Sequence, residues 1–257
     1  MHQASVPHRQ VLADVEADVC FLEVEVILYN PFQNLTKPEW FLWSLSVVTI
    51  IASFMISGGF FVLTLIASLV GVTALIFLAK GDVWGQILTV LFSVLYAMIS
   101  LRFRYYGEMI TYLGMTAPIA ALSIITWLRH PYAGTTEVKV HQMNRQQTVW
   151  LIIGSTVVTI VFYFILDAFG TSNLLISTIS ITTSFLASCL MLFRSPKYAL
   201  AYAANDLVLI ILWILAAMDD RSYLPMIACF VMFLINDLYG YVNWIRMGKR
   251  QKLYQAR

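Results

Sequence analysis

Long apolar runs without a charged side chain fill most of this chain beyond Trp40. Lys, Arg, Asp and Glu are absent from residues 40–79, 83–101, 109–128, 146–166 and 168–193. Because about 20 apolar residues cross a bilayer, the first run holds two helices, and we expect the break at Ser57-Gly58-Gly59. With two more runs near the C-terminus, the pattern predicts eight membrane-spanning helices, at about 40–56, 60–79, 84–101, 109–128, 148–168, 173–193, 198–218 and 223–245.

The composition indicates an integral membrane protein. Of the 257 residues, 60% are hydrophobic and 12% are charged, whereas soluble domains carry about 25% charged residues. Thirteen of the sixteen Lys and Arg residues lie on the side of the N-terminus, and only Arg102, Arg104 and Arg221 lie on the other. Since cytoplasmic segments are rich in Lys and Arg, we expect both termini in the cytoplasm. The basic tail from Arg246 then anchors at the membrane lipid, and no nucleic-acid partner is expected.

Motifs for catalysis, metal binding or cofactor binding are missing from the sequence. The three cysteines have no paired spacing, and the four histidines all lie outside the predicted spans. No nucleophile elbow, phosphate loop or zinc helix motif occurs. The sequence therefore predicts neither an enzyme nor a cofactor.

The chain repeats itself, which predicts its architecture. Ile125-Thr126-Trp127-Leu128-Arg129 and Val242-Asn243-Trp244-Ile245-Arg246 end spans four and eight at an offset of 117, and Leu95-Tyr96 matches Leu212-Trp213 at the same offset. Phe77-Leu78-Ala79-Lys80 and Met191-Leu192-Phe193-Arg194 close spans two and six at an offset of 114. We interpret these matches as two parallel three-helix repeats, with chance similarity of apolar helices as the alternative. Parallel repeats of this kind occur in membrane transporters, which bind the substrate between the two repeats.

The predicted fold is thus an all-α membrane protein with one leading helix and a 3+1+3 core. Its expected parts are a cytoplasmic leader (1–37), an extra helix (38–58), a first repeat (59–130), a loop with a linker helix (131–170), a second repeat (171–247) and a basic tail (248–257).

Two Asn-Asp pairs inside apolar spans are the candidate site. Asn205-Asp206 lies in span seven and Asn236-Asp237 in span eight. An aspartate at bilayer depth costs about 2.5–3.5 kcal/mol and normally faces a cavity or a partner. At 1.5 Å per residue, both acids lie about 12–14 Å from the cytoplasmic boundary, at one level. We therefore expect a polar chamber between the two helices.

Neighbouring side chains suit a nucleoside-like ligand. Asn236, Tyr239, Gly240 and Asn243 share one helical stripe, and Asn and Asp supply the donors and acceptors that ribose hydroxyls need. A planar base needs an aromatic wall, for which Trp213, Tyr96, Tyr112 and Tyr202 are candidates. A cationic ring would also be attracted to a carboxylate or an aromatic face.

The chain resembles the PnuC nicotinamide riboside transporters, within the Pnu group of vitamin transporters. The likeness covers residues 38–248 and rests on three blocks: Gly71-Val72 through Leu78-Ala79-Lys80-Gly81, Tyr105-Tyr106-Gly107-Glu108-Met109, and Phe233 through Trp244 with Asn236 and Tyr239-Gly240 between them. It implies a fold like that of SWEET sugar transporters, a homotrimer in the bacterial inner (plasma) membrane, and uptake of nicotinamide riboside by facilitated diffusion. A cytosolic kinase would trap the ligand.

One position departs from the family pattern. Relatives often carry Trp four residues before the Asn of span seven, where it stacks on the vitamin ring, and this chain has Ala201 there. Asn205 carries over, but the stacking Trp does not. Thiamine, riboflavin and deoxynucleosides are therefore alternative ligands.

Structural roles are the competing interpretation of the candidate residues. Asn205 and Asn236 could hold helices together by hydrogen bonds, and Tyr96 and Trp213 could pack against each other across the axis that relates the repeats. Asp206 and Asp237 could be protonated structural partners, and Asp237 alone could couple transport to protons. An intramembrane enzyme that uses both acids is a further alternative. Pro118 in span four is a candidate kink.

Overall fold

The computed structural model of the chain describes residues 29–57, 62–102, 105–171 and 173–255. Within these residues, eight helical segments are long and apolar enough to cross a membrane, as the hydrophobic runs predict. Residues 1–28 of the expected leader and Gly58-Gly59 of the first break lie outside the described residues.

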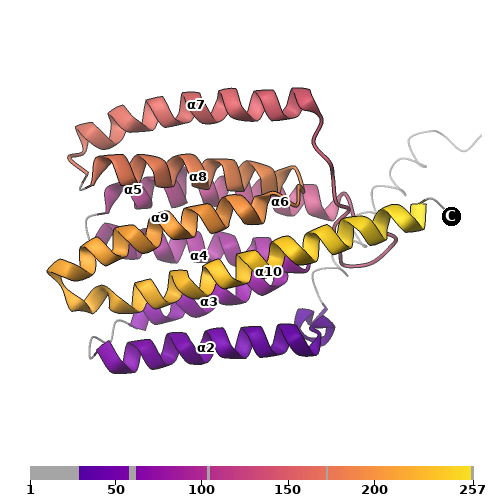
Figure 1. Cartoon of the computed structure of the whole chain (residues 1–257), viewed down its shortest axis with the longest axis horizontal. Coiled ribbons are helices and arrows are strands. Elements are labelled where there is room, and N and C mark those ends of the chain that lie inside the picture. Colours follow the sequence, from indigo (N-terminus) through magenta and orange to yellow (C-terminus); the bar gives the residue numbers. More distant parts are fainter. Residues whose placement is uncertain (1–28, 58–61, 103–104, 172, 256–257) are drawn as a thin grey trace, which may run out of the picture.

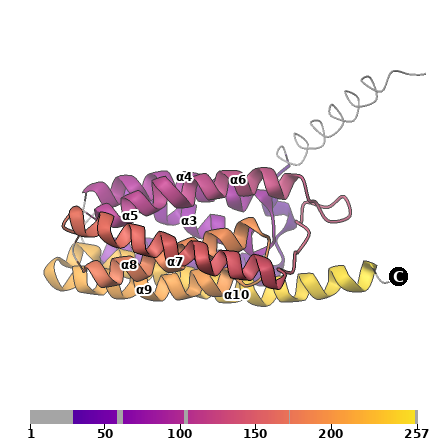
Figure 2. The same cartoon turned by 90° about the horizontal axis from the view of Figure 1, so that it is seen from above.

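The helices follow the predicted spans closely. They are α2 (Lys37–Ser57), α3 (Val62–Ala79), α4 (Val83–Arg102), α5 (Tyr106–Thr111) with η2 (Tyr112–Thr116) and α6 (Ala117–Leu128), α7 (Arg145–Ala168), α8 (Leu174–Leu192), α9 (Tyr198–Asp219) and α10 (Leu224–Gln255). Two short 3₁₀ turns, η1 (Pro31–Asn34) and η3 (Arg221–Tyr223), precede α2 and α10. The main difference is α10, which continues ten residues beyond the predicted end at 245, so that the basic tail prolongs the helix past the rest of the bundle (Figures 1 and 2).

Six spans form a closed ring. Within the first repeat α3 packs on α4 and α4 on α6, and within the second α8 packs on α9 and α9 on α10. Two contacts join the repeats: α10 against α3, and α6 against α8. Both seams bring the third helix of one repeat to the first helix of the other, as an axis between two parallel repeats requires. Figure 1 shows α2 and α7 at opposite edges, with α2 packed on α3 and α10, and α7 packed on α8.

The fourth span contains a π-helical turn. The amide of Ala117 donates to the carbonyl of Tyr112, five residues back, and the α-helix resumes at Ala117. Pro118 follows directly and has no amide hydrogen to donate to Gly114. At the place where Pro118 predicts a kink, the helix thus contains a π-bulge, a feature that occurs frequently at functional sites. Tyr112 and Thr116 of this turn are both buried.

The loops after α3, α6 and α8 and the end of α10 gather the basic residues, and we call this side of the bundle the basic end. The turns after α3 and α8 are alike: Gly81 and Arg194 both have positive φ, at 70° and 55°. Their amides donate to Leu78 and Met191, three residues back. The two turns therefore correspond at an offset of 113, one residue less than the sequence match, because Arg194 takes the left-handed position that glycine fills in the first repeat.

Candidate functional site

A small cavity lies inside the ring, between the two repeats. Its volume is about 50 Å³. Its lining comes from five elements: Gly71, Ala74, Leu75 and Leu78 of α3, Thr89 and Phe92 of α4, Tyr112 and Thr116 of η2, Tyr202, Asn205 and Asp206 of α9, and Phe233 and Asp237 of α10. Five of the candidate residues are thus brought together: Asn205, Asp206, Asp237, Tyr112 and Tyr202.

The two aspartates are direct neighbours in this cavity. Asp206 and Asp237 are each 3% exposed, and their side chains interact with each other. Among the described residues no Lys, Arg or His forms an ion pair with either carboxyl group, and Asp206 Oδ2 is buried without a hydrogen bond. Neighbouring carboxyl groups in a low-dielectric site repel each other when both are ionised. A proton or a cationic group beside the pair would relieve this repulsion.

Asn205 is held from α8 by three hydroxyl groups. Its Oδ1 accepts hydrogen bonds from Ser180 Oγ at 3.3 Å, Thr183 Oγ1 at 2.9 Å and Ser184 Oγ at 3.0 Å. These three residues share one face of α8, at i, i+3 and i+4. The contacts fix the carboxamide at the cavity wall. Asn205 therefore both joins α9 to α8 by hydrogen bonds and lines the cavity.

Aromatic side chains close the cavity toward the end opposite the basic one. Phe92, Tyr112 and Phe233 line it directly, and the ring of Tyr112 lies 4.4 Å from that of Tyr96. Trp213 Nε1 donates to the hydroxyl of Tyr96 at 3.1 Å. Both Tyr96 and Trp213 are fully buried and stand behind the lining, not in it. The structure thus shows Tyr96 and Trp213 in contact with each other, which is the packing role considered for them in the sequence analysis.

The stripe of α10 predicted to face the ligand faces other helices. Asn236 Nδ2 donates to Ser46 Oγ of α2 at 3.0 Å, and Tyr239 donates to Glu39 of α2 at 3.0 Å. Asn243 Nδ2 donates to the carbonyl of Ala79 in α3 at 2.9 Å. None of the three lines the cavity. Asp237 lies about 100° around the helix from Asn236, so in this structure Asp237 faces the ring interior while Asn236 faces α2.

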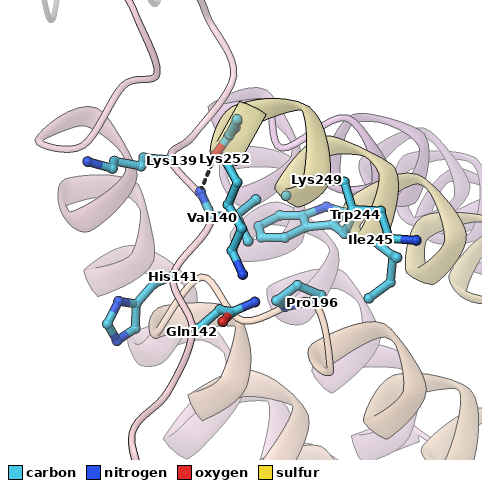
Figure 3. Close-up of a pocket in the computed structure, with 11 residues that line it drawn as sticks. Lys139, Val140, His141, Gln142, Pro196, Trp244, Ile245, Lys249 and Lys252 are labelled. Carbon is cyan, nitrogen blue, oxygen red and sulfur yellow. Dashed lines mark hydrogen bonds between the residues drawn. The ribbon is translucent and has the colours of Figure 1, made fainter. Parts of the chain in front are cut away.

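Tryptophans close the basic end in a repeated manner. Trp244 Nε1 of α10 donates to the carbonyl of Leu78 in α3 at 2.8 Å, and Trp127 Nε1 of α6 donates to that of Met191 in α8 at 3.3 Å. Each bond lies at one of the two seams between the repeats. Figure 3 shows Trp244 beside the loop before α7, and in that loop the amide of Val140 donates to Gln251 Oε1 at 2.8 Å. Trp127 is almost fully buried and Trp244 is fully buried. Their bonds between the repeats close the cavity side of the bundle at the basic end.

Sequence analysis missed the hydroxyl groups around the site. Ser180, Thr183 and Ser184 support Asn205, while Thr89 and Thr116 line the cavity. The spacing of the α8 hydroxyl groups, which places them on one helical face, could have indicated a polar contact with a neighbouring helix. It carries weight only once a partner on α9 is known, because Ser and Thr in membrane helices commonly bond to their own backbone.

The geometry describes a closed binding site. Pockets for drug-sized ligands have volumes of about 300–1,000 Å³, so a cavity of about 50 Å³ must enlarge to hold a nucleoside. Both ends are shut by contacts between the repeats, and the polar groups lie between them. Eight spans, a ring of two repeats and a closed polar centre define a multi-pass membrane transporter.

Comparison with known proteins gives the family. The family described as "Nicotinamide mononucleotide transporter" matches residues 61–246, and the chain belongs to it. The nicotinamide riboside transporter PnuC of Neisseria mucosa is 27% identical over 190 residues, which cover 72% of each chain. PnuC of Haemophilus influenzae is 25% identical over 190 residues, which cover 73% of this chain and 81% of the relative.

A solved structure shares the fold. The crystal structure of the vitamin B3 transporter PnuC aligns with a TM-score of 0.75 and 25% identity, and the match covers 85% of this chain and 94% of that one. The resemblance inferred from the blocks around Tyr105 and Asn236 is thereby confirmed.

Proposed function

We propose that the protein carries nicotinamide riboside across the membrane. The observation that carries this proposal is the pair of buried carboxyl groups, Asp206 and Asp237, in a cavity between the repeats. Nicotinamide riboside combines a cationic pyridinium ring with a ribose. The carboxyl pair suits the cation, and the amide of Asn205, whose oxygen is already engaged, has N–H groups to donate to a hydroxyl.

The same chemistry favours the riboside over the mononucleotide in the family description. A mononucleotide adds a phosphate group with up to two negative charges. The cavity is lined by two carboxyl groups and by no Lys or Arg among the described residues. Bringing like charges together at low dielectric is costly, so we expect the phosphate to be rejected.

Aromatic groups in the cavity offer a surface for the ring. Ala201 stands where relatives often carry a tryptophan, and the aromatic side chains that line the space are Phe92, Tyr112, Tyr202 and Phe233. We propose that Tyr202 takes the stacking role: it lies on α9 one residue after Ala201, and its hydroxyl is fixed by Ser188 at 3.1 Å.

Movement of the two repeats would expose the site to each side in turn. The aromatic layer of Tyr96 and Trp213 closes one end, and the seams of Trp127 and Trp244 close the basic end. We propose alternating access in which one closure opens while the other holds, with net flow down the ligand gradient. By the positive-inside bias, the basic end faces the cytoplasm.

Uptake into liposomes tests the proposal. Purified protein should equilibrate radiolabelled nicotinamide riboside across the vesicle membrane, whereas nicotinamide mononucleotide should neither enter nor compete at equal concentration. Thiamine, riboflavin and deoxynucleosides serve as further competitors, and chromatography of the vesicle contents should return unaltered riboside. Preferred transport of one of these competitors, or a changed product, would refute the assignment.

Two partners follow from the family resemblance. We propose that three copies assemble in the membrane and that a cytosolic kinase traps the riboside by phosphorylation. A complex of about three times the 29.2 kDa chain mass, measured by light scattering after correction for detergent, tests the first. Accumulation of label only when kinase and ATP are enclosed in the vesicles tests the second.

A further inference from the structure

Arg194 carries a partly buried charge without a counter-charge among the described residues. It follows α8 at the basic end, in the left-handed turn described above. Its Nε and Nη1 are buried and make no hydrogen bond to any described residue, and burial lowers its pKa from the usual value. Arginine nevertheless stays protonated in proteins. A guanidinium group in this position calls for an anion.

The first repeat shows how the equivalent turn meets that need. Lys80 lies at the turn after α3, and its Nζ is 3.0 Å from Glu39 Oε2 of α2. Glu39 is almost fully buried. The leading helix α2 therefore supplies a carboxylate at the seam of α10 and α3. Near the seam of α6 and α8 the additional helix is α7, which packs on α8. No described acidic residue pairs with Arg194 there.

A surface hollow of about 440 Å³ adjoins Arg194. His141 and Gln147 line it and are tied together, with His141 Nε2 and Gln147 Oε1 at 3.1 Å. The amide of His141 also donates to the carbonyl of Arg194 at 3.1 Å. The polar side of the hollow is thus a built structure, and its side chains include no carboxylate.

The other side of the hollow is apolar. Leu122 and Ile125 of α6 line it and are 54% and 49% exposed, on a helix that crosses the membrane. Since Arg194 lies two residues beyond the end of the α8 span, it stands at the level of the lipid head groups. Acyl chains would cover Leu122 and Ile125 while a phosphate reaches the guanidinium.

We propose that this hollow binds an anionic phospholipid, whose phosphate pairs with Arg194 and whose acyl chains lie along α6. At the α6–α8 seam the lipid phosphate supplies the negative charge for Arg194, as Glu39 of α2 supplies it for Lys80 at the α10–α3 seam. Arginine binds phosphate through two parallel hydrogen bonds, and the cytoplasmic leaflet is rich in anionic lipids. The site lies beside Trp127, so an occupant would stabilise the closed seam.

Native mass spectrometry of the purified protein tests the proposal. We titrate phosphatidylglycerol, an anionic lipid, and phosphatidylcholine, which has no net charge, and compare the affinity for the first bound lipid. The intact protein should prefer phosphatidylglycerol by about tenfold, and Arg194→Gln should lose most of that preference. Lys197→Gln, which removes an exposed charge three residues away, should retain it.

Further variants and probes make the outcome decisive. Arg194→Lys, which keeps the charge but not the paired hydrogen bonds, should lose about two- to fivefold in affinity and covers the case in which Arg194→Gln does not fold. Soluble glycerol 3-phosphate should compete only weakly. Equal binding by the protein and Arg194→Gln, equal loss in Lys197→Gln, or full competition by glycerol 3-phosphate would each overturn the proposal.

Discussion

Trp213 donates a hydrogen bond to Tyr96, the residue at the same position of the other repeat. The distance from Nε1 to the hydroxyl is 3.1 Å, and both side chains are fully buried. Residues related by the axis between the repeats can meet directly only when they lie close to that axis. The pair therefore marks the axis, and the proposed separation of the repeats at this end would require its contact to change.

The first prediction concerns this pair. Tyr96→Phe removes the hydrogen bond and should lower the free energy of unfolding by about 0.5–1.5 kcal/mol. Trp213→Phe should cost more, because it also removes ring contacts. In a double-mutant cycle measured by thermal unfolding in detergent, the two changes should not add. Strict additivity would show that the contact contributes nothing to the closed end.

The second prediction concerns charge at the site. Asp206→Asn and Asp237→Asn should each weaken binding of cationic nicotinamide riboside by about tenfold or more, or about 1.4 kcal/mol. The neutral reduced form, dihydronicotinamide riboside, should be affected much less, because it presents no cation to the pair. Isothermal titration with both compounds checks this. An equal loss for both forms would mean that the carboxyl groups recognise shape or hydroxyls and not charge.

The third prediction separates two roles of Asn205. Asn205→Ala takes the acceptor from three hydroxyl groups of α8 and should lower both stability, by about 1–3 kcal/mol, and binding. Asn205→Asp keeps an acceptor oxygen and loses the amide donor, so binding should be lost while thermal stability falls less. If Asn205→Asp binds the riboside normally, the amide does not contact the ligand.

The fourth prediction concerns Asn236, which contacts α2 and not the cavity. Asn236→Ala should reduce stability by about 1–2 kcal/mol by removing the bond to Ser46. Uptake per folded molecule should stay within about threefold of the unaltered protein, because the cavity lining is intact. Ser46→Ala is the matched control and should produce a similar loss of stability. Loss of binding with normal stability would return Asn236 to the site.

The fifth prediction uses the two seams as controls for each other. Trp244→Phe should speed amide hydrogen exchange in the turn after α3, and Trp127→Phe should do so in the turn after α8. Loss of about 1 kcal/mol of local stability raises exchange by about fivefold. Mass spectrometry of peptides that cover residues 79–82 and 192–195 distinguishes the two. Acceleration at both turns in either variant would show that the seams open together.

The sequence was sufficient to predict the spans and the shared level of the two aspartates, for physical reasons. Charged residues are excluded from lipid, so the uncharged runs delimit the helices within a few residues. Asp206 and Asp237 share one depth, and residues at the same depth on packed helices can meet. The structure places them side by side.

The direction in which each helix faces could not be predicted. Lipid-facing and protein-facing sides are both apolar in a membrane bundle, so periodicity does not distinguish them. Asn236 and Asp237 are adjacent in the sequence, yet one contacts α2 and the other lines the cavity. The order of the helices in the ring determines which side of α10 faces the cavity, and that order depends on the contacts of α10 with both α9 and α3. The π-bulge at Tyr112 likewise has no signature beyond the nearby Pro118.

The carbonyl of Leu78 accepts hydrogen bonds from Trp244 at 2.8 Å and from Tyr198 at 3.2 Å. Two aromatic donors from the second repeat thus converge on a main-chain atom, which is the same whatever amino acid occupies position 78. A side-chain substitution at that position would report on side-chain packing and leave the two hydrogen bonds to the carbonyl in place. Replacing the peptide bond after Leu78 by an ester, which weakens the carbonyl as an acceptor, is the change that would address these bonds.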